Sequence, residues 1–317
     1  MTASKPGVLL MTYGSPASLD REDVRTYLAR VRGGREPDSA LVDEFTRRYR
    51  VIGCSPLIDI TRAQAADLAR VLGWPVEVGM RFSEPSIITG LSALVDAGVT
   101  DVAAIILSPQ YSPLLMNGYA AAIDAARSAM GARAPDVSVA GSWHEQPAFI
   151  AALADRVSRA LDGLRSGERD GVGVLMTAHS LPKRVAATEP DYLAQLRDTA
   201  VAVATAAGLG ADRWTFCWQS AGHEPGEWMK PDFADLMLLI GKSRTPSVLV
   251  VPIQFLADHL EILYDVEVGA REQAEAHGVA FHRIDSLNAD PGLMAALAAV
   301  ATETMHGSQR AMVPAAP

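Results

Sequence analysis

Residues 173–182, GVLMTAHSLP, form an apolar run that ends in a histidine, a serine and a proline, and a second copy lies near the N-terminus. Residues 7–16 read GVLLMTYGSP, with the same Met-Thr pair, and end on Tyr13 where the later copy ends on His179. A short apolar run bounded by turn residues is typical of a buried β-strand. The two copies therefore predict two equivalent strands, each followed by a different polar side chain.

Strand candidates follow each copy in the same order, with Ala-rich and Leu-rich helical stretches between them. In the first half they are residues 8–12, 76–79, 102–107 and 137–140, and in the second half residues 172–177, 214–218, 247–252 and 279–284. This alternation is expected of a parallel sheet covered by helices on both faces. We therefore predict an α/β protein with two similar Rossmann-like lobes, each built on a parallel four-stranded sheet.

The ends of the third strands correspond as well, because SPQY at residues 108–111 matches PIQF at residues 252–255. Open parallel sheets bind ligands beyond the carboxyl ends of their strands. We expect the two lobes to face a central cleft, which Tyr13 and His179 would reach from opposite walls.

The composition limits the partners and the compartment. The chain has 317 residues, a net charge of −9 and 49% hydrophobic residues. Binding to nucleic acid or to an anionic membrane surface needs an excess of Lys and Arg, so neither is expected. Cys54 and Cys217 are too few for a disulfide framework, and no apolar stretch reaches the ~20 residues that span a bilayer. We predict a cytoplasmic protein without a transmembrane segment, and peripheral contact with a membrane stays open.

An insertion at residues 18–60 separates the first two strands of the first half. It concentrates arginine in an otherwise acidic chain, at Arg30, Arg32, Arg35, Arg47, Arg48 and Arg50. One interpretation is a solvated helix face whose arginines pair with Glu36, Asp43 and Glu44. The other is a lip over the cleft whose guanidiniums hold ligand carboxylates bidentately. The composition alone leaves both open.

Two polar segments of the second half could carry chemistry. His179 is either a turn residue or a general base, because an imidazole exchanges protons near neutral pH. Glu261 and Asp265 stand four residues apart, so they share one helix face and suit a divalent cation or a proton path. The alternative for Glu261 is a capping box with Asp258, in which its carboxylate returns to the backbone.

Six segments, taken in order, resemble the signature of the ferrochelatase family: MTYGSP, RYRVIGCSPL, SPQYS, TAHSLP, WQSAGHEPGEW and PIQFLADHLEILYD. The similarity runs from about residue 7 to residue 300 and is strongest to the bacterial coproporphyrin III ferrochelatases. It implies a monomer with two chelatase-type lobes, over residues 1–145 and 146–305, the first carrying the lip at 18–60 and the second the catalytic residues. We expect residues 306–317 to form a disordered tail.

The resemblance implies roles for the catalytic residues. His179 would be the proton acceptor or metal-handling histidine, and Glu261 its partner carboxylate on the facing wall, so that both would also meet Fe2+. Asp265 would belong to an outer metal site, although Gly269 interrupts the acidic line that continues in some relatives.

The resemblance also implies a set of substrate-binding residues. Tyr13 would approach the metal from the other macrocycle face, and Ser220, in the WQSAG segment, would line the cleft. The positions that hold propionates in the coproporphyrin type are Arg32, Arg48, Ser55 and Tyr119. Gly33 stands where relatives carry a second basic residue, so one contact to the porphyrin rim is absent or supplied by Arg30 or Arg35.

The implied function is insertion of Fe2+ into a porphyrin in haem biosynthesis, with coproporphyrin III giving coprohaem. Metal enters only after two pyrrole N–H protons leave, so a neutral histidine backed by carboxylates would supply general-base catalysis. Fe2+ would be a substrate, with no tightly bound cofactor and no iron–sulfur cluster, for which two cysteines are too few. The alternatives are a protoporphyrin IX ferrochelatase giving protohaem, a chelatase for a more carboxylated tetrapyrrole, and a haem-binding protein without catalysis.

Overall fold

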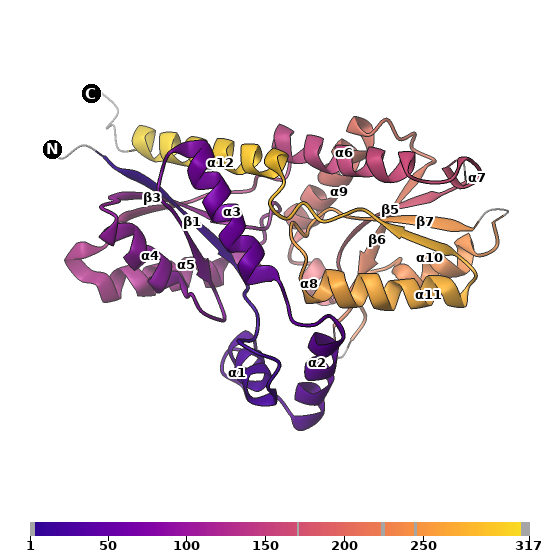
Figure 1. Cartoon of the computed structure of the whole chain (residues 1–317), viewed down its shortest axis with the longest axis horizontal. Coiled ribbons are helices and arrows are strands. Elements are labelled where there is room, and N and C mark those ends of the chain that lie inside the picture. Colours follow the sequence, from indigo (N-terminus) through magenta and orange to yellow (C-terminus); the bar gives the residue numbers. More distant parts are fainter. Residues whose placement is uncertain (1–3, 170, 223–225, 244–245, 312–317) are drawn as a thin grey trace. The chain divides into compact units, whose positions relative to one another are not determined.

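The computed structural model describes residues 4–169, 171–222, 226–243 and 246–311. The chain divides into two compact units. The N-terminal unit holds the residues up to Trp143 together with those from Asn288 onward, and the C-terminal unit is His144–Leu287. Figure 1 shows that each unit is a sheet flanked by helices.

The N-terminal unit is built on a parallel four-stranded sheet in the order β2-β1-β3-β4. Its strands are β1 (Pro6–Thr12), β2 (Val76–Met80), β3 (Asp101–Ile106) and β4 (Asp136–Val139). Alternate residues of a strand face opposite sides of the sheet. Accordingly, Leu9 and Met11 of β1 are buried in one apolar cluster with residues of α4 (Ile87–Asp96) and α5 (Pro113–Met130).

The other helices of this unit have two roles. α3 (Leu57–Leu72) contacts β1 and β2, while α12 (Pro291–Ala311) contacts β3, β4 and α3. Figure 1 shows α12 beside α3. α1 (Arg21–Val31) and α2 (Ser39–Val51) form the Arg-rich insertion and pack on each other. A single 3-10 turn, η1 (Gly131–Arg133), leads into β4.

The C-terminal unit repeats the same topology, with strand order β6-β5-β7-β8. Its strands are β5 (Gly173–His179), β6 (Trp214–Gln219), β7 (Ser247–Pro252) and β8 (Ala280–Arg283). Its helices are α6 (Pro147–Asp162), α7 (Ser166–Arg169), α8 (Lys183–Ala186), α9 (Pro190–Ala206), α10 (Phe233–Ile240), the π-helix η2 (Glu261–Ala270) and α11 (Arg271–Ala276). All eight predicted strands and the predicted duplication are confirmed.

The last helix corrects the predicted domain boundary. Leu293, Leu297 and Ala301 recur on one helix face and are fully buried. This apolar stripe packs α12 onto α3 and β3, so the chain after Leu287 belongs to the N-terminal unit rather than to a second lobe ending at residue 305. The predicted disordered tail is also wrong for residues 306–311, which continue α12, whereas residues 312–317 lie outside the described part.

None of the described helices is both long enough and apolar enough to cross a bilayer.

Candidate active site

His179 is the last residue of β5, and its backbone is held in place by hydrogen bonds. Its N–H donates to Oε1 of Gln254 at 2.9 Å, and Nε2 of Gln254 donates to the hydroxyl of Tyr192 at 2.6 Å. Both Gln254 and Tyr192 are buried. A central strand and a buried amide therefore fix the position from which the imidazole extends.

Glu261, the first residue of η2, contacts this imidazole directly. Oε2 of Glu261 lies 2.8 Å from Nδ1 of His179, and each side chain is 33% exposed. The capping-box interpretation of Glu261 is therefore wrong, because its carboxylate contacts the side chain of His179 in β5 instead of returning to the backbone near Asp258. π-Helices are rare and often occur at functional sites.

The pair shifts the proton affinity of both partners. Burial alone lowers the pKa of His179, but the negative charge and hydrogen bond of Glu261 outweigh it, and the pKa lies above its ordinary value. Burial alone raises the pKa of Glu261, but the imidazole outweighs it, and the pKa lies below its ordinary value. The arrangement therefore favours an ion pair whenever His179 is protonated.

The surroundings of the pair are aromatic and acidic. The ring of Phe255 lies edge-on to His179 at 6.5 Å and to His259 at 4.6 Å, measured between centroids. The charge of Asp265 also contributes to the raised pKa of His179. Within the described ranges, no three His, Cys, Asp or Glu side chains are grouped as a metal site. The metal contacts of His179 and Glu261 and the outer site at Asp265 stay predictions.

Unpartnered polar atoms lie where β5 and β6 end side by side. His179 pairs in register with Gln219, and the N–H of Ser180 donates to the Gln219 carbonyl at 2.7 Å. Within the described part of the chain, the buried atoms Oγ of Ser180, Nε2 of Gln219 and Oγ of Ser220 have no hydrogen-bond partner. Ser220 also has a positive φ of 55°. These atoms offer free donors beside His179, while His223 of the same motif lies outside the described residues.

Tyr13 follows β1 in the N-terminal unit and presents its ring to solvent. It is 38% exposed and packs against Phe82 at 5.0 Å between ring centroids. The turn after it is fixed, because the Tyr27 hydroxyl donates to the carbonyl of Gly14 at 3.1 Å. Tyr13 thus lies at the carboxyl end of its strand, as predicted.

Arg81, which the sequence interpretation missed, lies beside this tyrosine. Its guanidinium carbon lies 4.7 Å from the Phe82 ring centroid and 5.2 Å from that of Tyr119, and Nη1 donates to the Leu115 carbonyl at 3.1 Å. It lines a cavity of about 550 Å³ with Phe82, Arg25 and Arg30 among others. The sequence feature that could have indicated Arg81 is its position directly after the second strand. A basic residue at such a position also occurs by chance.

Tyr119 lies beneath that guanidinium rather than at the surface. Its side chain is 3% exposed and belongs to the core cluster of α4 and α5. Burial raises its pKa well above the ordinary value, so the phenol is neutral. In this structure Tyr119 supports Arg81, and its direct contact with a propionate stays a prediction.

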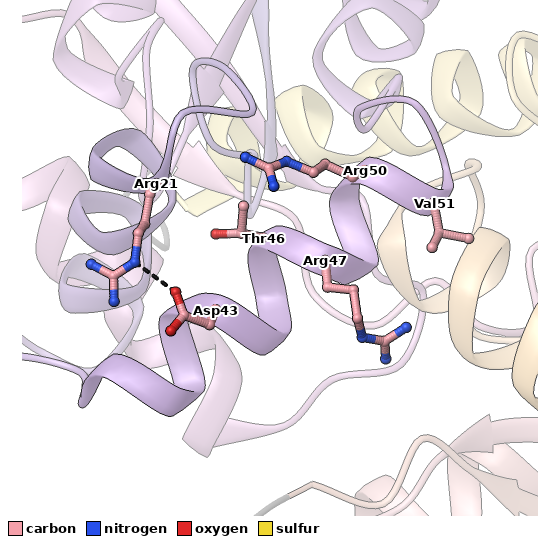
Figure 2. A pocket seen from close by; sticks show the side chains of 6 residues that line it. All are labelled: Arg21, Asp43, Thr46, Arg47, Arg50 and Val51. Carbon is pink, nitrogen blue, oxygen red and sulfur yellow. Dashed lines mark hydrogen bonds and ion pairs between the residues drawn. The ribbon is translucent and has the colours of Figure 1, made fainter.

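The Arg-rich insertion contains both paired and unpaired arginines. Arg21 pairs with Asp43 at 2.6 Å, and Glu44 accepts from both Arg47 and Arg48. Figure 2 shows Arg21, Arg47 and Arg50 around a cavity of about 400 Å³ between α1 and α2. Four exposed arginines form no ion pair with a described carboxylate: Arg30, Arg32, Arg35 and Arg50. The solvated-face interpretation therefore holds for the paired arginines, and carboxylate binding by the unpaired ones stays a prediction.

The three residues of the insertion that are predicted to bind propionates differ in exposure and in the hydrogen bonds they already form. Arg32 caps the end of α1 and is exposed. Arg48 is only 20% exposed, donates from Nε to Glu44 at 2.8 Å and lies over the Phe45 ring. Ser55 is half-buried and its hydroxyl accepts from the N–H of Leu57 at 3.4 Å. Arg32 is thus exposed, whereas Arg48 and Ser55 are half-buried.

Comparison with known proteins gives consistent matches over the whole chain. The ferrochelatase family model matches residues 5–305. A ferrochelatase of Deinococcus radiodurans is 38% identical over 307 residues, which cover 95% of this chain and 96% of that protein. The coproporphyrin III ferrochelatases of Geobacillus thermodenitrificans and Bacillus subtilis are 33% and 30% identical, each over 95% of this chain and over 96% and 98% of their own lengths.

Solved structures match the fold at low sequence identity. SirB from Bacillus subtilis with Fe3+ has a TM-score of 0.59 at 14% identity and covers 96% of this chain and 97% of its own. CbiX, described as the terminal enzyme of sirohaem biosynthesis in denitrifying bacteria, has a TM-score of 0.52 at 15% identity and covers 96% and 99%. The predicted chelatase-type fold is confirmed.

Proposed function

This chain belongs to the ferrochelatase family, and we propose that its porphyrin substrate is coproporphyrin III, which it converts to coprohaem. Its sequence-based identification as a ferrochelatase, a lyase that inserts iron into a porphyrin in haem biosynthesis, is confirmed by the family match over residues 5–305. The alternative of a haem-binding protein without catalysis is therefore set aside. Fe2+ and the porphyrin are the substrates.

The observation that carries the proposed mechanism is the contact between Nδ1 of His179 and Oε2 of Glu261 at 2.8 Å. In the neutral imidazole, one nitrogen is a donor and the other an acceptor. Nδ1–H donating to the Glu261 carboxylate leaves the lone pair on Nε2, which has no partner among the described residues. Nε2 is then the atom that takes a pyrrole proton.

The second function of Glu261 follows the proton transfer. Once Nε2 is protonated, the imidazolium faces the Glu261 carboxylate, which stabilises its charge. Two protons leave the macrocycle for each Fe2+ that enters, so the first must pass to solvent before the second is taken up. Asp265, whose charge acts on His179, is the proposed next acceptor on this route.

The choice of coproporphyrin III rests on the unpaired arginines of the insertion. Coproporphyrin III carries four propionates, twice as many as protoporphyrin IX, and each needs a cationic or hydrogen-bonding partner. Arg30, Arg32, Arg35 and Arg50 are exposed and form no ion pair with a described carboxylate. An arginine fork matches a carboxylate bidentately. Several relatives at 30–33% identity bear the name coproporphyrin III ferrochelatase, which supports the same choice.

Further substrate contacts are proposed at the other predicted positions. Tyr13 offers an exposed aromatic ring to a flat macrocycle. Ser220 offers a hydroxyl without a described partner, and Arg48 and Ser55 offer hydrogen bonds to propionates after releasing Glu44 and Leu57. That Tyr13 and His179 contact opposite faces of the macrocycle stays a prediction, as does the monomeric state.

The experiment is anaerobic Fe2+ insertion by the purified protein, followed by absorbance, with coproporphyrin III and protoporphyrin IX supplied separately at equal concentration. A higher kcat/KM for coproporphyrin III is expected. A higher kcat/KM for protoporphyrin IX would overturn the proposed substrate while leaving iron insertion in place. The relative at 38% identity is named simply ferrochelatase, so protoporphyrin IX is the second candidate.

A further inference from the structure

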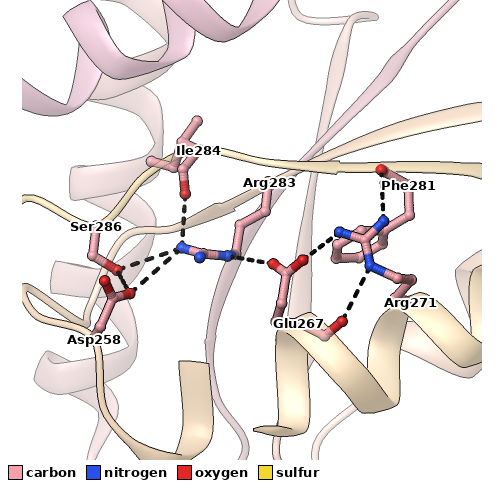
Figure 3. Close-up of polar contacts among 7 residues, drawn as sticks. All are labelled: Asp258, Glu267, Arg271, Phe281, Arg283, Ile284 and Ser286. Carbon is pink, nitrogen blue, oxygen red and sulfur yellow. Dashed lines mark hydrogen bonds and ion pairs between the residues drawn. The ribbon is translucent and has the colours of Figure 1, made fainter. Parts of the chain in front are cut away.

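A polar network ties the π-helix to the edge of its own sheet. Nε of Arg283, on β8, donates to Oε2 of Glu267 in η2 at 3.0 Å. Nη1 of Arg283 donates to the Ile284 carbonyl at 2.9 Å and to the Ser286 hydroxyl at 3.5 Å, and that hydroxyl donates to Oδ1 of Asp258 at 2.7 Å. Figure 3 shows Arg283 at the centre of these contacts. One guanidinium therefore links two separate points of the segment that carries Glu261.

These two points lie on either side of Glu261. Asp258 precedes it by three residues and Glu267 follows it by six. The Arg283 side chain is only 12% exposed, and those of Asp258 and Glu267 are 22% and 34% exposed. Hydrogen bonds to partly buried charged groups are among the stronger ones in proteins. The segment from Asp258 to Glu267 is thus held at both of these residues, with Glu261 between them.

The anchor of the network is the sheet that also carries His179. Arg283 pairs in register with Val250 of β7, and Val250 pairs with Leu175 of β5, the strand that ends at His179. Backbone pairing from β8 through β7 to β5 therefore connects Arg283 with the strand that ends at His179. The contacts of Arg283 with Glu267 and Asp258 connect η2 to the same sheet.

A π-helix is the element for which such an anchor matters most. Its i→i+5 hydrogen bonds are rare beyond a single turn, whereas η2 spans ten residues. A π-helix turns less per residue than an α-helix does, so relaxation to the α form would rotate Glu261 relative to Glu267. Arg271 also bonds the Glu267 carboxylate, from the next turn, while its guanidinium packs on Phe281 at 4.6 Å. Arg283, in contrast, reaches both Asp258, which precedes η2, and Glu267, which lies within it.

We propose that Arg283 is a positioning residue for iron insertion, which holds Glu261 in hydrogen-bond contact with His179 by fixing Asp258, just before η2, and Glu267, within it. The inference rests on the proposed role of the His179–Glu261 pair. Among the described residues, Arg283 forms no hydrogen bond or ion pair with His179 or Glu261, so its effect on the chemistry is indirect. Burial alone raises the pKa of Glu267, but the hydrogen bonds and charges of Arg271 and Arg283 outweigh it, so the pKa lies below its ordinary value and the carboxyl stays charged toward Arg283.

The first test measures kcat and KM separately in anaerobic Fe2+ insertion for Arg283→Met and Arg283→Lys. Methionine keeps an unbranched stem and removes the hydrogen bonds. We expect kcat to fall by roughly 10- to 100-fold, the loss that a displacement of about 1 Å produces. We expect KM for the porphyrin to stay within about twofold, because uniform binding is unchanged. Lysine should restore part of kcat, since its charge still faces Glu267.

A matched control separates this effect from general loss of an ion pair. Arg159 of α6 pairs with Asp155 at 2.6 Å in the same unit and is outside the network. Arg159→Met should leave kcat and KM unchanged. Circular dichroism should show the same folded content for all variants before their kinetics are compared.

A double-mutant cycle with Glu261→Gln decides between positioning and a purely structural role. If Arg283 acts through Glu261, the double variant loses no more kcat than Glu261→Gln alone. Losses that multiply, or an unchanged kcat for Arg283→Met beside an impaired Glu261→Gln, would overturn the inference. If the Glu261→Gln single variant inserts iron as fast as the parent, the proposed catalytic pair itself fails, and with it the role of Arg283.

Discussion

The guanidinium of Arg81 lies directly against Gly118, where an added Cβ would come within 1.7 Å of Nη2. Gly118 is in the interior of α5, a position where glycine is unfavourable by itself. The absence of a side chain therefore makes room for Arg81 between the rings of Phe82 and Tyr119.

This relationship predicts opposite effects of one substitution in two backgrounds. In the parent, Gly118→Ala gains roughly 0.5–1 kcal/mol of helix propensity. It displaces Arg81 from a charged hydrogen bond and a ring contact, which together contribute about 2 kcal/mol. We expect net destabilisation of about 1 kcal/mol, measured by urea unfolding. In an Arg81→Met background the same substitution should be stabilising, and destabilisation of similar size in both backgrounds would contradict this account.

The His179–Glu261 pair predicts how stability depends on pH. The raised pKa of His179 means that its contribution is complete below the unfolded value of 6.5 and is lost as pH rises through the folded pKa. The lowered pKa of Glu261 means that its contribution is present above the unfolded value of 4.5 and is lost as pH falls through the folded pKa. The pair therefore stabilises most between these two values. The difference in unfolding temperature between the parent and Glu261→Gln should peak near pH 5–6. A difference that grows toward pH 9 would contradict the assignment.

The unpaired arginines predict a change in porphyrin binding without a change in chemistry. Arg32→Met should raise KM for coproporphyrin III by about fivefold with kcat unchanged, the size of one exposed charge-assisted contact of roughly 1 kcal/mol. Added salt should reduce the difference between variant and parent, because exposed charges are screened. The matched control is Arg133→Met, which removes another exposed arginine. Nη1 of Arg133 lies 3.8 Å from Oδ1 of Asp96. Equal effects of the two substitutions would argue against a specific carboxylate contact at Arg32.

The sequence predicted the eight strands because each is a short apolar run with its own turn residues. It also placed Tyr13 and His179 at carboxyl ends of strands, where the structure has them. Local sequence patterns could not predict the contact of Glu261 with His179, because the two residues are 82 positions apart. The spacing from Asp258 to Glu261 also fits a helix cap equally well. The resemblance to the ferrochelatase family predicted that pairing, and in the structure the two side chains are 2.8 Å apart.

Other features depend on packing that no local pattern reports. The apolar stripe of α12 predicts a buried helix face but not which sheet buries it, so the return of the chain to the first unit was missed. Arg81 was missed because its position depends on contacts with Gly118, Phe82 and Tyr119, of which Gly118 and Tyr119 are distant in the chain. The π-helix was missed because its residues read equally well as an α-helix.

Anaerobic Fe2+ insertion by His179→Ala, with porphyrin binding measured separately by fluorescence, tests directly whether His179 is the general base. Loss of a general base should lower kcat by about 10²- to 10⁴-fold, while the folded protein still binds porphyrin. His277→Ala, at an exposed histidine of the same unit, should insert iron at the parent rate. A His179→Ala protein that inserts iron as fast as the parent would contradict the account.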